Sequence, residues 1–209
     1  MLRHSPFRFI LAIVLLPVFA IGQAPVPAKP NPKDFRLLLE PRFQAPPVWE
    51  LVTGAKETGV AAGIVGKNGE PRFLRPEELK LAQIDFAAFR RDTMVHIDKL
   101  FDDTKPRRVL AKDGKTSTHC IYHAKSPLIA SIVFSTKLRD RHKQEYGETL
   151  LAVAPDRYTL VIMPADPDIL EGRSELLASI FDQSVYPISL EVFQIDATGI
   201  RVVGNLSGQ

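Results

Sequence analysis

The stretch from Tyr146 to Val203 constrains the fold of this chain more than any other. Two apolar runs, Leu150–Val153 and Tyr158–Met163, flank the turn residues Ala154-Pro155-Asp156-Arg157. Short apolar runs on either side of turn residues are typical of a β-hairpin, so we predict one with a four-residue connection. A helical segment follows, and then a second strand pair broken at Ala197-Thr198-Gly199. The stretch predicts strands packed on a helix, and it predicts no reaction.

Two further hairpins are predicted upstream. In the first, Val60–Val65 pairs with Arg72–Leu74 across Lys67-Asn68-Gly69, because Asn-Gly accepts the positive φ angles of a tight turn. In the second, Arg107–Ala111 and Thr116–Tyr122 flank a short polar turn. Hairpins make antiparallel pairing the natural expectation.

Helices are predicted between the hairpins. Asp85, Ser126 and Asp166 belong to the residue types that cap helix N-termini, and each precedes a segment with apolar residues at helical spacing. A shorter helix is expected to begin at Pro76, and Gly147 suits the end of the helix that starts at Ser126. Successive hairpins that alternate with about three α-helices predict an α+β fold with a mixed or antiparallel sheet.

Residues 1–20 have the pattern of a signal peptide. Arg3 and Arg8 supply the positive charge, Phe9–Leu16 is continuously apolar, and Val18-Phe19-Ala20 provides the small residues of a cleavage site. We predict cleavage after Ala20 and therefore a secreted or periplasmic protein. An uncleaved anchor is the alternative, but the apolar stretch of about 13 residues is shorter than the roughly 20 that a span needs. We expect no membrane span after the leader is removed.

Prolines separate the leader from the rest of the chain, since seven of the 17 lie between Pro25 and Pro47. Because proline favours extended, solvated backbone, residues 21–48 are predicted to be a linker. One α+β domain is expected at 49–204 and a tail at 205–209. Cleavage after Ala24 is the alternative start of the mature chain, although a proline would then follow the cut directly.

Part of this linker is apolar. We expect a tether to about Lys33, and Phe35–Leu39 and Trp49 are candidates to dock on the domain. A ligand for a proline-recognition domain is the alternative role for the segment.

The charge balance does not favour a polyanionic partner. Removing Arg3 and Arg8 with the leader leaves 25 of the 27 basic residues against 24 acidic residues, a net charge of +1. Lys137–Lys143 is a basic run, but no aromatic residues alternate with its charges, and cations near a helix end favour the helix dipole. We therefore predict no nucleic-acid partner.

The segment Glu50–Gly66 resembles a phosphate-binding loop in composition, with a lysine and glycines at positions 54, 59, 63 and 66. Its spacing matches neither GxxxxGK[ST] nor GxGxxG. We therefore interpret it as the strand of the first hairpin and its approach.

The sequence H-C-x-x-H at His119, Cys120 and His123 offers three ligands for a metal ion such as zinc. On a strand, however, the two histidines share a face about 13 Å apart while the cysteine points the other way. A cysteine nucleophile needs a paired base and a lowered pKa, and Cys120 has histidine neighbours only in sequence. As the only cysteine, it allows no intramolecular disulfide. We predict ordinary strand side chains here.

Other candidate chemistry is weaker. Asp166, Asp168 and Glu171 could bind a hard cation, but carboxylates also collect at helix starts because the dipole favours them. No GxSxG elbow of a serine hydrolase is present. We predict no metal site and no cofactor.

The predicted binding site is the turn between the apolar runs Leu150–Val153 and Tyr158–Met163. It consists of Asp156, Arg157 and Tyr158 after a rigid proline. It combines an ion pair with an aromatic hydroxyl, and loops on rigid scaffolds carry function disproportionately. A solvated turn without function is the alternative.

Several segments resemble a known family. They are SPLIASIVFSTKL, LLAVAP, DRYTLVIM and YPISLEVF, and upstream FLRPEELKLAQIDFAAFRRDTMVHIDKL. Together these segments are similar to the YtpQ-like family, a bacterial domain of unknown function, over about Val60–Val203. Tyr158 replaces the family's usual acidic residue, Asp98-Lys99-Leu100 replaces its Asn-Leu ending, and the leader contrasts with its cytoplasmic members. The resemblance implies a fold and brings no activity or catalytic residues.

The sequence as a whole favours an exported, non-enzymatic binding or interaction module of the bacterial envelope. Its partner would be an unidentified envelope protein or ligand. The alternative is a small exported hydrolase or metal-dependent enzyme. That alternative requires Cys120 and its histidine neighbours, or the acidic group at 166–171, to converge in a pocket.

Overall fold

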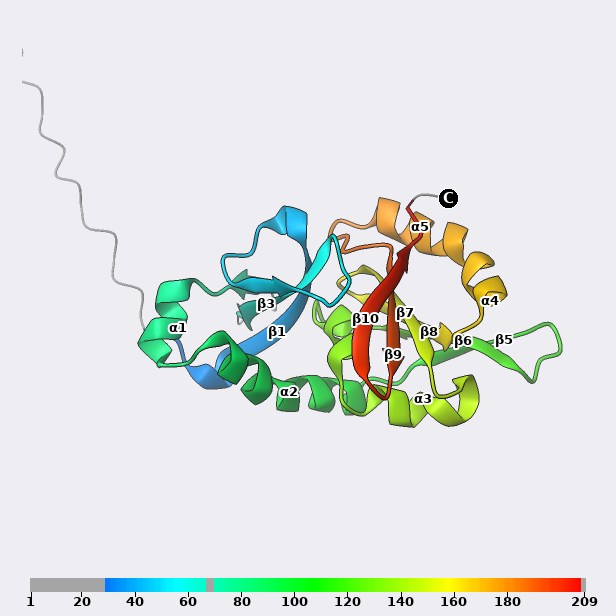
Figure 1. Ribbon diagram of the computed structural model, residues 1–209, viewed down its shortest axis with the longest axis horizontal. Coiled ribbons are helices and arrows are strands. Elements are labelled where there is room, and N and C mark those ends of the chain that lie inside the picture. The colour runs from blue at the N-terminus through cyan, green and yellow to red at the C-terminus, as the bar shows by residue number, and fades with distance from the viewer. Residues whose placement is uncertain (1–28, 67–69, 208–209) are drawn as a thin grey trace, which may run out of the picture.

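A computed structural model describes residues 29–66 and 70–207 of the chain (Figure 1). These residues form ten strands and five α-helices, which confirms the predicted α+β class. The strands are β1 (Phe35–Pro41), β2 (Trp49–Leu51), β3 (Thr58–Val65), β4 (Pro71–Phe73), β5 (Arg107–Leu110), β6 (Ser117–His123), β7 (Leu150–Asp156), β8 (Thr159–Pro164), β9 (Glu191–Asp196) and β10 (Gly199–Asn205). The helices are α1 (Pro76–Ala82), α2 (Phe86–Asp103), α3 (Leu138–Tyr146), α4 (Pro167–Glu171) and α5 (Ser174–Gln183).

The strands form two antiparallel sheets. Sheet A has the order β1-β3-β2, with β4 also paired to β3. The β3–β4 pairing confirms the first predicted hairpin, whose turn at 67–69 lies outside the described residues. Strand β3 is rich in small residues because neighbouring side chains cover it. A Cβ atom at Gly59 would lie 2.0 Å from the Trp49 ring, and one at Gly63 would lie 2.4 Å from the Leu38 side chain.

Strand β1 corrects the predicted linker. The interval 21–48 was predicted to be a linker in which Phe35–Leu39 could dock on the domain, yet Phe35–Pro41 is a strand that pairs along its whole length with β3. Phe35, Leu37 and Leu39 are buried in the main core. The prolines mislead here because they flank the strand, and Pro41 at its end is on an edge strand, where proline is tolerated.

Sheet B has the order β10-β9-β7-β8-β6-β5, so each predicted hairpin in this half of the chain is present. The prediction of a four-residue connection in the β7–β8 hairpin is wrong. Strand β7 continues through an irregularity after Val153, and Asp156 pairs with Thr159. Only Arg157 and Tyr158 therefore connect the two strands.

Two predicted helices are broken. The helix expected from Ser126 is a 3-10 helix at Ile129–Phe134 followed by α3, and Asp98 of α2 holds the backbone between them. Its carboxylate accepts hydrogen bonds from the Ser135 hydroxyl at 2.7 Å and from the Thr136 N–H at 3.0 Å. The last predicted helix is divided into α4 and α5. None of the helices in the described ranges combines the length and apolar character that a membrane span requires.

Sheet B separates two cores. Its inner face, with Cys120, Tyr122 and Phe193, packs on α2, α3 and sheet A as one continuous core. Its outer face, with Val153, Val161 and Leu177 of α5 among the buried residues, is covered by α4 and α5 (Figure 1). The strand ends beside α5 are where candidate functional side chains gather.

Candidate functional site

Arg157 of the predicted binding turn is part of the packing between the two sheets. Its Nη2 donates a hydrogen bond at 2.8 Å to Oε2 of Glu40 on β1, whose side chain is 1% exposed. The guanidinium also lies 5.3 Å from the ring centre of Tyr186. Burial raises the pKa of Glu40, and the hydrogen bond from Arg157 opposes that rise. The turn is therefore not a solvated loop tip.

Asp156 does not form the expected ion pair with Arg157. One carboxylate oxygen accepts a hydrogen bond from the Tyr158 N–H at 3.0 Å, and no cation among the described residues pairs with this carboxylate. Asp156 is nevertheless only 9% exposed. Tyr158 lies against Tyr186, with ring centres 6.0 Å apart. Of the three predicted site residues, Asp156 alone lines a cavity, and its second carboxylate oxygen accepts no hydrogen bond from a described residue.

This cavity has a volume of about 450 Å³, within the range of small-molecule sites. We call it the α5 cavity. It is lined by Lys105, Arg107, Ile121, His123, Asp156, Thr159, Leu176 and Ile180. One wall is apolar, since Leu176 and Ile180 stand one turn apart on α5 above Ile121 of β6. Leu176 is 47% exposed, so the wall is open to a ligand.

Strand register places the polar groups of the α5 cavity in one row. Asp156, Thr159 and His123 are successive partners across β7, β8 and β6. The His123 ring is 3.1 Å from the Thr159 hydroxyl through Nδ1. At the edge of the sheet, Arg107 of β5 is paired with Ile121, and Lys105 precedes it. Neither cation forms an ion pair or side-chain hydrogen bond with another described residue.

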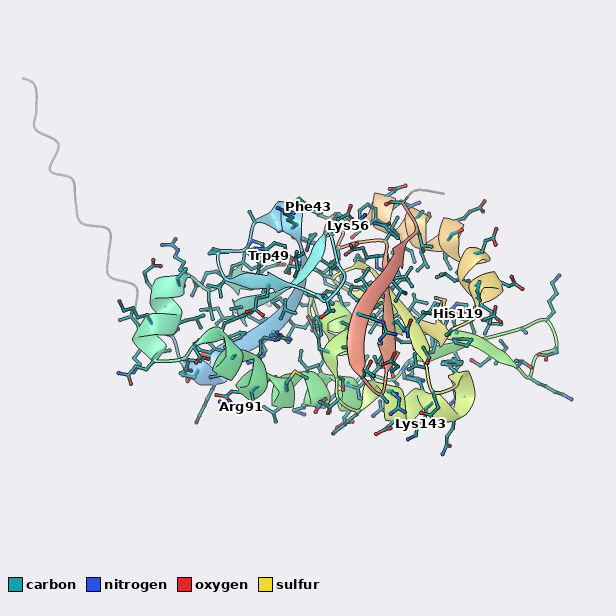
Figure 2. The ribbon with its side chains drawn as sticks, in the orientation of Figure 1. Phe43, Trp49, Lys56, Arg91, His119 and Lys143 are labelled. Atoms are coloured by element: carbon teal, nitrogen blue, oxygen red, sulfur yellow. The ribbon has the colours of Figure 1, made fainter. Side chains whose placement is uncertain are left out.

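The H-C-x-x-H residues do not converge. His123 lies in the α5 cavity, and His119 is buried on the same face of β6, whereas Cys120 points into the main core. Burial raises the pKa of the Cys120 thiol to about 12, which disfavours a nucleophilic thiolate. Figure 2 shows His119 on the sheet B side of the molecule, away from Trp49 and Phe43 on the sheet A side.

The acidic group at 166–171 has a local role in helix formation. Asp166 accepts a hydrogen bond from the Asp168 N–H at 2.9 Å and so caps α4. Across the described ranges, no three His, Cys, Asp or Glu side chains are placed to hold one metal ion. The side chains named for the hydrolase or metal-enzyme alternative are therefore dispersed.

A buried aromatic cluster was not predicted from the sequence. The His142 ring of α3 accepts or donates a hydrogen bond at 2.7 Å with the Tyr122 hydroxyl, and it stacks on Tyr146 with ring centres 5.7 Å apart. Burial lowers the pKa of His142 to about 4, and the charge of Arg141 adds to this effect. Burial also lowers the pKa of His119 to about 4. Both histidines are therefore neutral in the folded protein near pH 7.

These histidines predict an acid-dependent loss of stability. Each has an ordinary pKa of 6.5 and a folded pKa of about 4. Below pH 6.5 the unfolded chain therefore binds protons that the folded chain does not. The stabilisation is complete above pH 6.5 and is lost as the pH falls towards 4. We expect the free energy of unfolding, measured with urea, to fall by about 1–2 kcal/mol per histidine between pH 7 and pH 5.

The variant His142→Gln isolates this effect, because glutamine keeps a hydrogen-bonding group beside Tyr122 but does not titrate. The free energy of unfolding of this variant at pH 7 is the reference for its own value at pH 5. We expect a shallower fall towards pH 5 than in the unmodified chain. An equally steep fall would exclude His142 as a source of the pH dependence.

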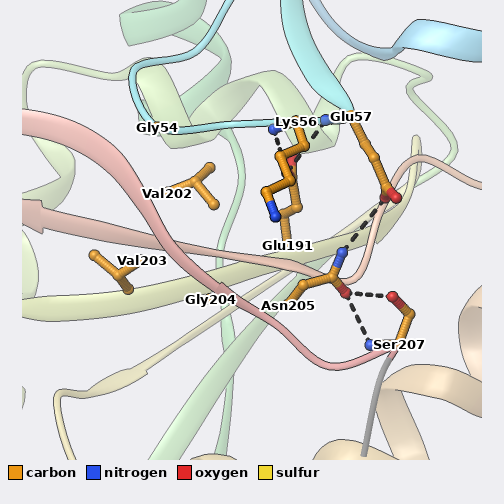
Figure 3. A pocket seen from close by; sticks show the side chains of 9 residues that line it. All are labelled: Gly54, Lys56, Glu57, Glu191, Val202, Val203, Gly204, Asn205 and Ser207. Atoms are coloured by element: carbon orange, nitrogen blue, oxygen red, sulfur yellow. Dashed lines mark hydrogen bonds between the residues drawn. The ribbon is translucent and has the colours of Figure 1, made fainter.

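The segment that resembled a phosphate-binding loop does bind an anion, and that anion is Glu191 of β9. Figure 3 shows its carboxylate beneath Lys56 and Glu57. It accepts hydrogen bonds from the N–H groups of Lys56 at 2.6 Å, Glu57 at 3.2 Å and Thr58 at 3.0 Å, and from the Thr58 hydroxyl. Successive backbone N–H groups of this kind form an anion-binding nest. The nest is filled from within the chain and joins sheet A to sheet B.

A cavity of about 480 Å³ lies beside this nest, between the 54–57 loop and the end of β10 (Figure 3). Several of its polar side chains are engaged within the chain. Asn205 accepts hydrogen bonds from the N–H and the hydroxyl of Ser207, and Glu191 is held as described. The Lys56 ammonium in this lining has no ion pair with a described residue either, but only the α5 cavity combines two such cations with the exposed apolar side chain of Leu176, so it is the better candidate for a ligand site.

The basic run on α3 is engaged in ion pairs. Lys137 and Arg141 both contact Asp102 of α2, at 2.5 and 2.9 Å. Lys143, labelled in Figure 2, pairs with Asp140 at 2.9 Å, and Arg139 pairs with Glu148. These cations therefore stabilise the position of α3, and the prediction of no nucleic-acid partner stays a prediction.

We found no protein family, no curated protein and no solved structure that matches this chain. The similarity to the YtpQ-like family over about residues 60–203 therefore stays a prediction, and the function must be argued from the site itself.

Proposed function

We propose that this chain is an exported, non-enzymatic binding module of the bacterial envelope, and that it binds a small organic anion in the α5 cavity. The observation that carries the proposal is the pair of cations, Lys105 and Arg107, that have no partner among the described residues and stand beside an open apolar wall. The pattern of residues 1–20, which lie outside the described part, supports export.

The chemistry of the cavity supports an anionic ligand. Arginine binds carboxylates through paired N–H groups, and charge-assisted hydrogen bonds are about twice as strong as neutral ones. The exposed side chain of Leu176 and its neighbour Ile180 provide apolar surface for the body of the ligand. Pockets that combine apolar walls with a few placed polar groups are typical of small-molecule sites.

The test is a binding measurement by calorimetry on the chain from Ile21 to Gln209, with 4-methylpentanoate as the probe. The probe has a carboxylate and a branched apolar tail. We expect Arg107→Ala to weaken binding by about 10- to 100-fold, because a hydrogen bond to a charged group contributes about 1.5–3 kcal/mol.

Arg91→Ala is the matched control. Arg91 is an exposed arginine of α2 that pairs only with its neighbour Asp92, and it lies away from the α5 cavity (Figure 2). Binding by this variant should equal that of the unmodified chain. No detectable binding, or equal losses in the two variants, would contradict the proposed function.

A further inference from the structure

Asp156 gives the α5 cavity a negative end. It is only 9% exposed, yet among the described residues it has no cationic partner and its carboxylate accepts only the hydrogen bond from Tyr158. Buried carboxylates are normally paired, since an unpaired buried charge is costly. The second carboxylate oxygen, which accepts no hydrogen bond from a described residue, belongs to a side chain that lines the cavity. A positive group on the ligand would complete its environment.

The cations stand at the opposite end of the same cavity. Asp156 is on β7 and Arg107 is on β5, with β8 and β6 between them. Neighbouring strands lie about 4.8 Å apart, so β7 and β5 are about 14 Å apart, and Arg107 stands two residues along the strands from the row of Asp156 because it pairs with Ile121. The long side chains of Arg107 and Lys105 can span much of this distance. The cavity therefore has opposite charges at its two ends.

The middle of the row offers neutral hydrogen-bonding groups. His123 uses Nδ1 on the Thr159 hydroxyl, and its other ring nitrogen has no partner among the described side chains. The apolar wall of Leu176 and Ile180 runs beside this row. A ligand that fits has an ammonium group, a carboxylate and a branched apolar side chain.

We infer that the ligand of the α5 cavity is an aliphatic zwitterion of the amino-acid type, with its ammonium group on Asp156, its carboxylate on Arg107 and Lys105, and its side chain on Leu176 and Ile180. This inference rests on the proposed function. A free amino acid and a short peptide share this chemistry. An extended dipeptide spans about 7 Å and places its peptide group beside His123 and Thr159, whereas a free amino acid brings its charges closer together.

Four probes test the inference on the chain from Ile21 to Gln209. They are L-leucine, L-leucyl-L-leucine, 4-methylpentanoate, which lacks the ammonium group, and 3-methylbutylamine, which lacks the carboxylate. Calorimetry should show that at least one zwitterion binds tenfold or more tightly than either singly charged probe. The preference between leucine and the dipeptide identifies the source of the ligand.

The variant Asp156→Asn assigns the effect to one residue. An asparagine oxygen can still accept the hydrogen bond from Tyr158, so the turn is retained. We expect the variant to lose the tenfold advantage of the zwitterion while its affinity for 4-methylpentanoate is no weaker. Asp92→Asn, an exposed carboxylate on α2, should change neither affinity.

The possible failures are distinguishable. If 4-methylpentanoate binds as tightly as both zwitterions, the inference is wrong and the proposed function stands. If no probe binds, both are wrong. Should Asp156→Asn fail to fold, the comparison of the four probes on the unmodified chain still decides the question.

Discussion

Replacing Glu40 by alanine is expected to lower the free energy of unfolding by about 3–5 kcal/mol. The variant leaves the Arg157 guanidinium buried without its carboxylate partner, and removal of one member of a buried ion pair is strongly destabilising. Urea denaturation at pH 7 measures the loss. Glu50→Ala breaks the exposed pair with Arg90 and should cost no more than about 1 kcal/mol.

The double variant Glu40→Leu with Arg157→Met tests whether the loss in Glu40→Ala comes from the unpaired charge of Arg157, because it removes both charged groups. Apolar residues of similar volume often replace a buried ion pair without loss of stability. We therefore expect the double variant to be much more stable than Glu40→Ala. If the single and double variants lose the same amount, packing around Glu40, and not the unpaired charge, determines the effect.

Removal of the Glu191 carboxylate is expected to have the second large effect. Glu191→Ala leaves three backbone N–H groups and the Thr58 hydroxyl without their common acceptor. Each buried donor left unsatisfied costs about 1–3 kcal/mol, so we expect a total loss of about 3 kcal/mol or more. Urea denaturation gives the total. Hydrogen exchange should show faster exchange at the amides of Lys56 and Thr58.

Two variants control for side-chain loss alone. Glu57→Ala removes an exposed carboxylate from the same loop and should have an effect of less than about 0.5 kcal/mol. Glu191→Gln keeps an acceptor oxygen and should fall between the unmodified chain and Glu191→Ala. A loss in Glu191→Ala no larger than in Glu57→Ala would show that the nest does not join the sheets.

Local sequence signals predicted the hairpins because a hairpin is determined by a turn and the apolar runs beside it. The β5–β6, β7–β8 and β9–β10 pairs all join neighbours in the chain. Phe35–Leu39 was named only as a segment that could dock, and its pairing as strand β1 was missed for the opposite reason. It pairs with β3 across an intervening loop, and the prolines around it resemble a linker. The interruption before α3 was missed because Asp98, which accepts a hydrogen bond from Ser135 there, is 37 residues away from it in the chain.

The candidate site was predicted only in part. Asp156 and His123 were singled out for separate reasons, and nothing local in the sequence indicated that they share a cavity. Their common row depends on the pairing of β6 with β8, which are not consecutive in the chain. Arg107 was named only as the first residue of a predicted strand, and Lys105 was not singled out. The helical spacing of apolar residues after Asp166 predicted a helix, but it could not indicate that Leu176 is half exposed.

The contacts that join sheet A to the C-terminal half of the chain have a consequence for how the chain folds. The loop at 56–58 is held by a side chain up to 135 residues later, and Glu40 is paired with a residue 117 positions away. The N-terminal sheet therefore cannot reach its final stability until nearly the whole chain is available. Such distant contacts slow folding, because the entropy of closing long loops is lost before the contacts form. We expect the two sheets to form and to unfold together in a single transition, with the first strand among the last elements to be secured.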